Sequence, residues 1–305
     1  MQSLSPKKIS ICQFQLSEAQ PVIGSRNLHP ERRGPCWNMH YGLEFGLACS
    51  GKERRLFLDK SEMNVEAGDV WFCGMWEPHG MEVVTAPCEV IILGIWPPLL
   101  AQMHFPEAPG FCPLAPFNAP PKQRPRTSKK TKETMIKFGK QLKEIISSDT
   151  PHQTLRLRLA LMEILLCIFE SWPEAISWSR RAPAAELSQI NPALEMVFER
   201  HSFFSTDDAA RACGMNRHKF SVLFRSWMNI GFSDFSLRHR LYQAAAQLCA
   251  TRDPIKSIAL QWGFVDESHF YRIFMKHYDF SPHEYRNHMF LRKSGAKNSL
   301  PAVAI

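Results

Sequence analysis

The sequence predicts an α+β protein with several domains: an N-terminal β-barrel, a helical linker and a C-terminal all-α domain. Three observations support this order. Residues 36–97 hold short apolar and aromatic runs separated by turn residues, which is typical of strands. From residue 128 the apolar residues recur at helical spacing. Beyond residue 191 the chain reads as short helices, among which two pairs are each separated by a glycine.

The composition limits the class of protein. A chain of 305 residues suits two or three domains, and 45% hydrophobic residues can fill their cores. The nine cysteines form no Cys-x-x-Cys pair, which favours a reducing compartment. The sequence has neither an apolar run of about 18 residues nor a signal peptide. We therefore expect a cytoplasmic, nucleoid-associated protein without a membrane partner.

The net charge of +8 is unevenly distributed. Residues 1–120 hold nine Lys/Arg and twelve Asp/Glu, whereas residues 121–143 hold nine Lys/Arg and one acidic residue. Residues 191–290 hold twelve against ten, a difference of only +2. The excess lies in a connector, so global charge is weak evidence for nucleic-acid binding.

The expected strands of the N-terminal region are "LEFGLACSG", "RLFLD", "DVWFCG", "MEVVT" and "CEVIILGIW". Several short strands at close spacing indicate a barrel or a sandwich. The proline-rich segment 105–125 follows, where helices and central strands are both disfavoured. We place the first domain at residues 1–120.

Two helices separated by "SSDTP" are expected between residues 128 and 172. Their apolar stripe of Leu155, Leu159, Met162 and Leu166 predicts a homodimer contact, or else packing back on the barrel. The segment 176–189 reads as a linker because Pro183 interrupts a helix. Residues 121–190 are therefore interpreted as a basic connector and helical linker or dimerisation region.

The last pair of helices is marked by its boundaries. Asp253 is a good N-cap, Pro254 fits the first helical position, and Gly263 allows a left-handed turn. Asp266 caps the second helix, whose Phe270 and Phe274 face inward. Its outward side chains are Glu267, Ser268, Tyr271, Arg272, Met275 and Lys276.

The same order of signals occurs upstream. A Ser205/Thr206 cap starts a helix that turns at Gly214, and Asn216 caps the next helix. The outward side chains of that helix are Arg217, His218, Ser221, Val222 and Arg225. Residues 232–250 form a connecting helix, so two helix-turn-helix units would place two recognition helices in successive major grooves of double-stranded DNA.

The stretch "IKSIALQWGFVDESHFYRIFMKHYDFSPHEYR" resembles the signature of the AraC/XylS transcriptional regulators, and "AARACGMNRHKFSVLF" resembles that family's first unit. The resemblance covers residues 191–290 and leaves 291–305 as a flexible tail. It implies that Glu267, Ser268, His269, Tyr271 and Arg272, with His218, Ser221 and Val222, approach DNA. Two residues depart from the pattern: Val222 replaces a position that is often basic, and Asn229 replaces a usual glycine.

The N-terminal region resembles the cupin-like effector barrel of that family, through "HYGLEFGLACSG" and "VEAGDVWFCGMWEPHGMEVV". His40, Glu44 and His79 fall where enzymatic cupins keep metal ligands, but Gly42 replaces the usual second His. We therefore expect hydrogen-bonding histidines, with no metal and no cofactor. A pocket for a small, largely apolar or aromatic effector is expected near these three and Trp37, Trp71 and Trp76.

Three functions compete. The favoured one is a sequence-specific transcriptional regulator that responds to a small molecule, acts as a homodimer and has RNA polymerase as a candidate partner. The second is a metal-dependent cupin enzyme fused to a DNA-binding module, and the third is a nucleoid protein without sequence preference. The chain has no Walker loop, dinucleotide glycine fingerprint, His-Glu-x-x-His or Gly-x-Ser-x-Gly motif, so we expect no enzyme activity.

Overall fold

The computed structural model describes residues 10–12, 14, 16–103, 105–108, 110–173, 184–199, 202–228, 230–278 and 280–293. The chain divides into two compact units, one reaching Ala184 and the other beginning at Ala185. The expected tail beyond Lys293 and the position of Asn229 lie outside the described residues. No helix in the described ranges is long and apolar enough to cross a membrane.

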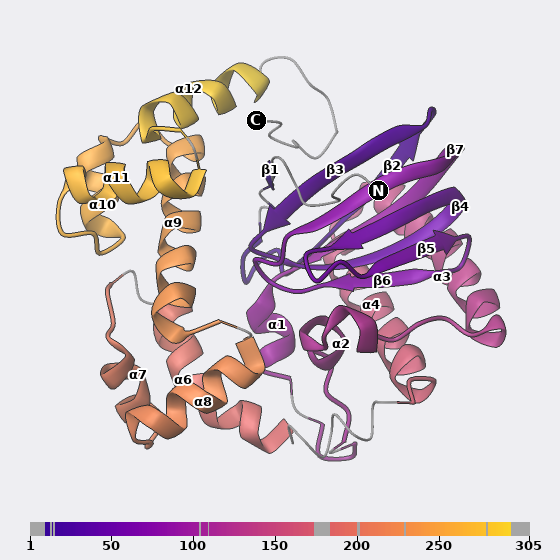
Figure 1. The fold of residues 1–305 in the computed structure, drawn as a ribbon, viewed down its shortest axis with the longest axis horizontal. Coiled ribbons are helices and arrows are strands. Elements are labelled where there is room, and N and C mark those ends of the chain that lie inside the picture. The colour runs from indigo at the N-terminus through magenta and orange to yellow at the C-terminus, as the bar shows by residue number, and fades with distance from the viewer. Residues whose placement is uncertain are drawn as a thin grey trace. The chain divides into compact units, whose positions relative to one another are not determined.

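The N-terminal unit is a seven-stranded sheet in which two long antiparallel strands make most of the pairings (Figure 1). β7 pairs with β2, β3 and β4, while β4 pairs with β5, β6 and β7. β1 is parallel to its neighbour, β3, and the other pairings among the described strands are antiparallel. The strands are β1 Ser10–Cys12, β2 Val22–His29, β3 Arg33–His40, β4 Leu43–Phe57, β5 Glu62–Glu66, β6 Val70–Cys73 and β7 His79–Ile95.

The strand prediction was right in type and wrong in length. "LEFGLACSG" and most of "RLFLD" are one strand, β4, and "MEVVT" and "CEVIILGIW" fall mostly within β7. β4 shifts register against β7 between Ala48 and Glu53, so the irregularities that we interpreted as turns are bulges. Residues 22–29, which lie before the predicted strands, form β2.

The helices of this unit cover the sheet. α3 (Lys129–Ser147) contacts β2, β4 and β7, and α4 (Gln153–Glu170) contacts α3 and β2. A Cβ at Gly24 of β2 would lie 2.7 Å from Ile146, which shows how closely α3 approaches. The helices that we separated from the barrel therefore belong to the same compact unit. Short helical turns follow the sheet: α1 Pro97–Ala101 precedes the proline-rich segment, which holds α2 Ala115–Asn118 and the 3-10 helix η1 Pro121–Gln123.

The C-terminal unit is all helical where it is described (Figure 1). Its first helix starts at Ala184, directly after Pro183, so the expected linker is shorter than 176–189. The long α9 packs against α8, α10 and α12 and supports both helix pairs. The helices are α6 Ala184–Glu199, α7 Thr206–Ala212, α8 Arg217–Met228, α9 Phe232–Ala250, α10 Ile255–Gln261, α11 Glu267–Tyr278 and α12 Pro282–Lys293.

Candidate nucleic-acid interface and buried charge network

The first helix pair, α7 and α8, forms as its capping residues predict. Ser205 and Asp208 make a reciprocal capping box at α7, and the backbone NH of Lys219 donates to Asn216 Oδ1 at 2.8 Å. Gly214 turns the chain with φ of +63°. Phe220 and Phe224 are fully buried, which fixes the opposite face of α8 toward solvent.

That outward face of α8 carries the predicted side chains. Arg217, His218 and Arg225 are exposed, Ser221 is half-buried, and Val222 is 58% exposed. The guanidinium of Arg217 pairs with Asp207 of α7 at 2.9 Å, so it is partly neutralised. An exposed valine on this face has no packing role and is suited to contact a thymine methyl.

The second pair, α10 and α11, has the same organisation with one shift. Pro254 is the N-cap and α10 starts at Ile255, one residue later than predicted, while Asp253 accepts a hydrogen bond from Gln247. Asp266 Oδ1 accepts from the backbone NH of His269 at 2.7 Å, as expected for the cap of α11. Phe264, Phe270 and Phe274 form the core.

The outward face of α11 is an open surface hollow lined by Glu267, Ser268, Tyr271, Arg272 and Met275. Arg272 is exposed, and none of the ion pairs among the described residues involves it. Its guanidinium therefore forms no ion pair with Asp266 or Glu267. Arg272 is free to donate to an acceptor outside the chain.

His269 is placed differently from the other predicted residues. Its ring lies against Phe264, with 6.1 Å between centroids, and its Nδ1 is buried. The side chain therefore packs at the edge of the core and is only half-exposed. Its predicted approach to DNA is less direct than that of Ser268 or Arg272.

Arg240 of α9 is a structural residue that the sequence did not reveal to us. Its guanidinium lies over the rings of Phe203 and Phe264, and its Nη1 donates to the carbonyl of Gly263 at 2.8 Å. Burial lowers the pKa of Arg240 to about 10. Arg240 thereby ties the turn of the second helix pair to the connecting helix.

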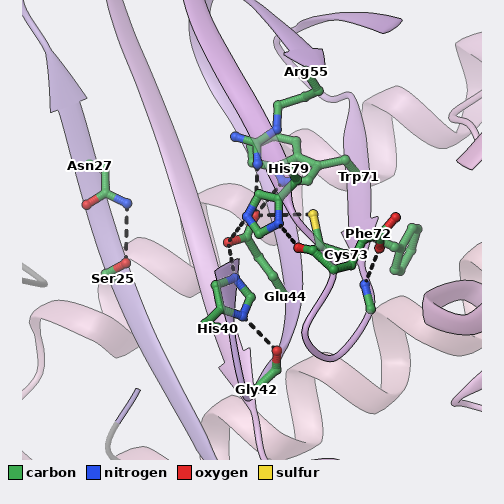
Figure 2. A network of polar contacts seen from close by, with 12 residues as sticks. Ser25, Asn27, His40, Gly42, Glu44, Arg55, Trp71, Phe72, Cys73 and His79 are labelled. Carbon is green, nitrogen blue, oxygen red and sulfur yellow. Dashed lines mark hydrogen bonds and ion pairs between the residues drawn. The ribbon is translucent and has the colours of Figure 1, made fainter. Parts of the chain in front are cut away.

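In the N-terminal unit, His40, Glu44 and His79 meet in a buried network (Figure 2). Glu44 Oε2 lies 3.1 Å from His40 Nε2 and 3.5 Å from His79 Nε2. The other oxygen, Oε1, accepts from Arg55 at 3.0 Å and from the indole NH of Trp71 at 2.8 Å. Each imidazole also contacts a backbone carbonyl through Nδ1, that of Gly42 for His40 and that of Glu77 for His79.

The charges of this network are set by mutual contact. Burial alone would raise the pKa of Glu44, but His79, His40 and Arg55 hold it well below its usual value. Burial alone would lower the pKa of His79, but Cys73 and Glu44 raise it well above its usual value. Burial lowers the pKa of His40. The network therefore holds the Glu44 carboxylate between the guanidinium of Arg55 and the imidazole of His79.

Of the predicted pocket residues, the structure joins Trp71 to the histidine cluster and places the other two tryptophans elsewhere. Trp37 packs over Gly80, and the Trp76 ring lies 5.6 Å from that of Tyr41. Arg55 and Glu53, which pair at 3.1 Å, were missed. The period-2 pattern offered a signal, because Glu53 and Arg55 alternate in phase with Phe57 and so share its inward face.

The three residues do not fit a divalent metal well. Their ligand atoms lie within 4.8 Å of one another, but both oxygens of Glu44 already contact His79, His40, Arg55 and Trp71. Gly42 removes a fourth donor, and a Cβ there would lie 2.7 Å from Leu16. The Arg55 guanidinium beside the Glu44 carboxylate opposes an added metal cation, so these donors suit an ion-pair cluster.

Comparisons with known proteins agree with this description. A family model described as a helix-turn-helix domain matches residues 209–288. The regulatory protein SoxS of Escherichia coli (strain K12) is 30% identical over 83 residues, which are 27% of this chain and 78% of SoxS. The regulatory protein PocR of Salmonella typhimurium is 31% identical over 107 residues, and the match spans only 35% of each protein.

The structure of this chain is also similar to a solved structure over most of its length. A crystal structure of ToxT from Vibrio cholerae with a bound unsaturated fatty acid covers 87% of this chain and 94% of its own, with a TM-score of 0.51 and 13% identity. At that identity the likeness is one of fold alone.

A helical unit with two helix-turn-helix pairs, each exposing a polar face, defines a DNA-binding protein. The chain belongs to the AraC/XylS family of transcriptional regulators, with a sheet-rich N-terminal unit and a C-terminal helix-turn-helix unit.

Proposed function

We propose that this regulator reads a specific DNA site through the outward faces of α8 and α11. The observation that carries the proposal is the exposed, unpaired Arg272 beside Ser268 and Tyr271 on a helix whose other face is core. On α8 the corresponding residues are His218, Ser221, Val222 and Arg225, with Arg217 tethered to Asp207. The two helices would enter successive major grooves, roughly 34 Å apart.

Selection of bound duplexes from a random pool tests this proposal. The expected result is one enriched site with two short conserved segments about 10 bp apart, because each recognition helix reads one groove. Competition with random-sequence DNA at physiological salt then gives a specificity ratio of roughly 10³ or more. A ratio near one would instead identify a nucleoid protein without sequence preference.

The N-terminal unit is proposed to bind a small, largely apolar or aromatic effector. Trp71 is buried in contact with Glu44 of the charge network, and the fold is shared with a ToxT structure that holds an unsaturated fatty acid. Oleate is therefore a suitable probe: we expect it to shift tryptophan fluorescence and to change the affinity for the selected site. If neither quantity changes, oleate is not the effector, and fractionated cell extract becomes the source for the same assay.

The regulator is further proposed to act as a homodimer through α4 and to contact RNA polymerase in the cytoplasmic nucleoid. Leu155, Leu159 and Leu166 support the dimer, because all three are exposed on one side of α4.

The cupin-enzyme alternative rests on His40, Glu44 and His79 alone. Protein purified without chelator should contain less than stoichiometric iron, manganese or zinc. Stoichiometric metal that is lost when His40 and His79 are replaced would support the enzyme.

A further inference from the structure

Segment 121–143 carries nine Lys/Arg and one acidic residue, Glu133. In the structure it is no loose connector, because it comprises η1 and most of α3, which is packed on the sheet. The positions of these cations are therefore fixed relative to the N-terminal unit.

Three of the nine cations serve the unit itself. Arg124 is buried and donates to Glu77 and to the carbonyl of Phe72, both at 2.7 Å. Lys132 pairs with Asp69 at 3.0 Å, and Lys143 pairs with Glu89. Each has a structural reason to be basic.

The other six cations are exposed, and none of the ion pairs in the described part of the chain involves them. We call this set the basic face: Lys122, Arg126, Lys129, Lys130, Lys137 and Lys140. At 3.6 residues per turn, its four α3 members fall within an arc of roughly 100°. The buried side of α3, with Met135, Phe138 and Leu142, lies opposite.

The helix dipole does not favour lysines at the start of α3. Lys129 and Lys130 occupy the first turn of α3, which contains no acidic residue. Cations there oppose the helix dipole, at a cost of about 0.3–1 kcal/mol each. An external anion would offset that cost.

The phosphates of bound DNA are such anions, and the DNA-binding unit itself carries little net charge. Residues 191–290 hold twelve Lys/Arg against ten Asp/Glu, a net charge of +2. Of those cations, Arg240 is buried, while Arg211 and Arg217 pair with Asp208 and Asp207. Release of counterions from phosphates supplies much of the affinity of DNA-binding proteins, so exposed cations outside this nearly neutral unit would add to that affinity.

We propose that the basic face binds the phosphates of duplex DNA that flanks the base-read site. Lys side chains on flexible stems suit this role, because they act as point charges and need no fixed geometry. The N-terminal unit thus contributes sequence-independent affinity, while α8 and α11 contribute the choice of site.

The test compares the full-length protein with the quadruple Gln variant of Lys129, Lys130, Lys137 and Lys140. A matched control replaces four exposed cations elsewhere in the same unit, Arg32, Arg33, Lys52 and Lys60, by Gln. Affinity is measured between 50 and 200 mM salt on two duplexes: the selected site alone, and the same site with about 20 bp added on each side. Thermal unfolding confirms that both variants are folded.

On the long duplex, the basic-face variant should lower the slope of log K against log salt by up to about 3.6, at about 0.9 per phosphate. On the short duplex it should match the wild type, and the control variant should match it on both. Base preference should not change, which separates this result from a failure of α8 or α11 to read the site. An unchanged slope on the long duplex would overturn the proposal, as would an equal loss in the control. In either case an acidic protein would be the next partner to test.

Discussion

At the scale of single residues, Arg272 is the sharpest test of the proposed DNA interface. It is exposed on α11 while Phe270 and Phe274 are fully buried, so its replacement leaves the core intact. Arg272→Ala should therefore leave the melting temperature within about 1 °C. It should weaken binding to the selected site by roughly 1–3 kcal/mol and relax preference at one base pair, because a bidentate contact to guanine is lost.

Arg272→Lys is the matched control for charge. Lysine keeps a phosphate contact but cannot reproduce the guanidinium fork, so base preference should still relax while the salt slope stays constant. Wild-type affinity and preference in the Arg272→Ala protein would show that Arg272 is no base reader.

The two turn glycines make a matched pair for stability. Gly214 and Gly263 have φ of +63° and +69°, but a Cβ at Gly214 would meet nothing within 4 Å, whereas one at Gly263 would lie 2.7 Å from the backbone N of Phe203. Gly214→Ala should cost about 1 kcal/mol for the left-handed backbone alone. Gly263→Ala should cost more, because backbone must also move, and urea unfolding of the two variants measures the difference. An equal loss in the free energy of unfolding for the two variants would mean that the backbone of residues 202–203 moves without energetic cost.

Glu44 determines the stability of the buried network. Glu44→Gln would leave Arg55 and His79 without their shared carboxylate, so we expect a loss of about 3–5 kcal/mol. Glu82→Gln is the control, because its partner Arg54 is a partly exposed surface residue and such pairs contribute about 0–1 kcal/mol. Calorimetry of the full-length protein resolves the transition of the N-terminal unit. A loss below 1 kcal/mol in Glu44→Gln would mean that water or a shifted side chain neutralises the network.

At the scale of elements, α4 uses one face and leaves another unused. Leu157, Leu161 and Ile164 are buried, while Leu155, Leu159 and Leu166 remain exposed. With half-buried Met162, the exposed stripe has the 4-3-4 spacing of a coiled-coil seam. The helix therefore packs on its own unit and still offers a seam to a second copy.

Charges beside the seam favour a parallel pair. With Leu155 and Met162 at d positions and Leu159 and Leu166 at a positions, Arg158 is a g residue and faces Glu163, the e residue five positions on in the second copy, whereas an antiparallel pair would place Arg158 and Glu163 on opposite sides of the seam. Leu159→Lys should convert the dimer to a monomer at micromolar concentration in light scattering. Leu28→Lys, an equally exposed leucine on β2, should not. Arg158→Glu should weaken the dimer and Glu163→Arg should restore it. A monomeric wild-type protein would reject the seam as a contact.

Elements were predictable where their signals are local. The ends of α7, α8 and α11 follow from Ser205, Asn216 and Asp266, each of which accepts the hydrogen bond that its position demands. β4 and β7 were divided because a bulge and a turn look alike in sequence. The difference lies in a partner strand some forty residues away, which local patterns cannot reveal.

At the scale of the whole molecule, the C-terminal unit is predictable from local sequence signals, whereas the N-terminal unit depends on the pairing of distant strands. The outward residues of the DNA-binding unit follow from helical periodicity: all of them are exposed or half-exposed, and His269 differs in that its ring packs against Phe264. The buried network was only half predicted. His40, Glu44 and His79 belong to a recognisable motif, but Arg55 comes from the part of β4 that pairs with β5 and β7, while the pairing of β4 with β6 brings Trp71 and Cys73 beside Glu44. That juxtaposition is a property of sheet register.

The division into units itself predicts that residues 185–293 fold and recognise DNA alone. SoxS supports this expectation, because a match of 83 residues covers 78% of it and leaves little for a second domain. The fragment should enrich the same base sequence from a random pool as the full chain, since α8, α9 and α11 all lie within it. It should bind more weakly and with a smaller salt slope, because it lacks both the α4 seam and the basic face. It should also fail to respond to the effector. A fragment that folds but selects a different sequence would show that the N-terminal unit sets the spacing of the recognition helices.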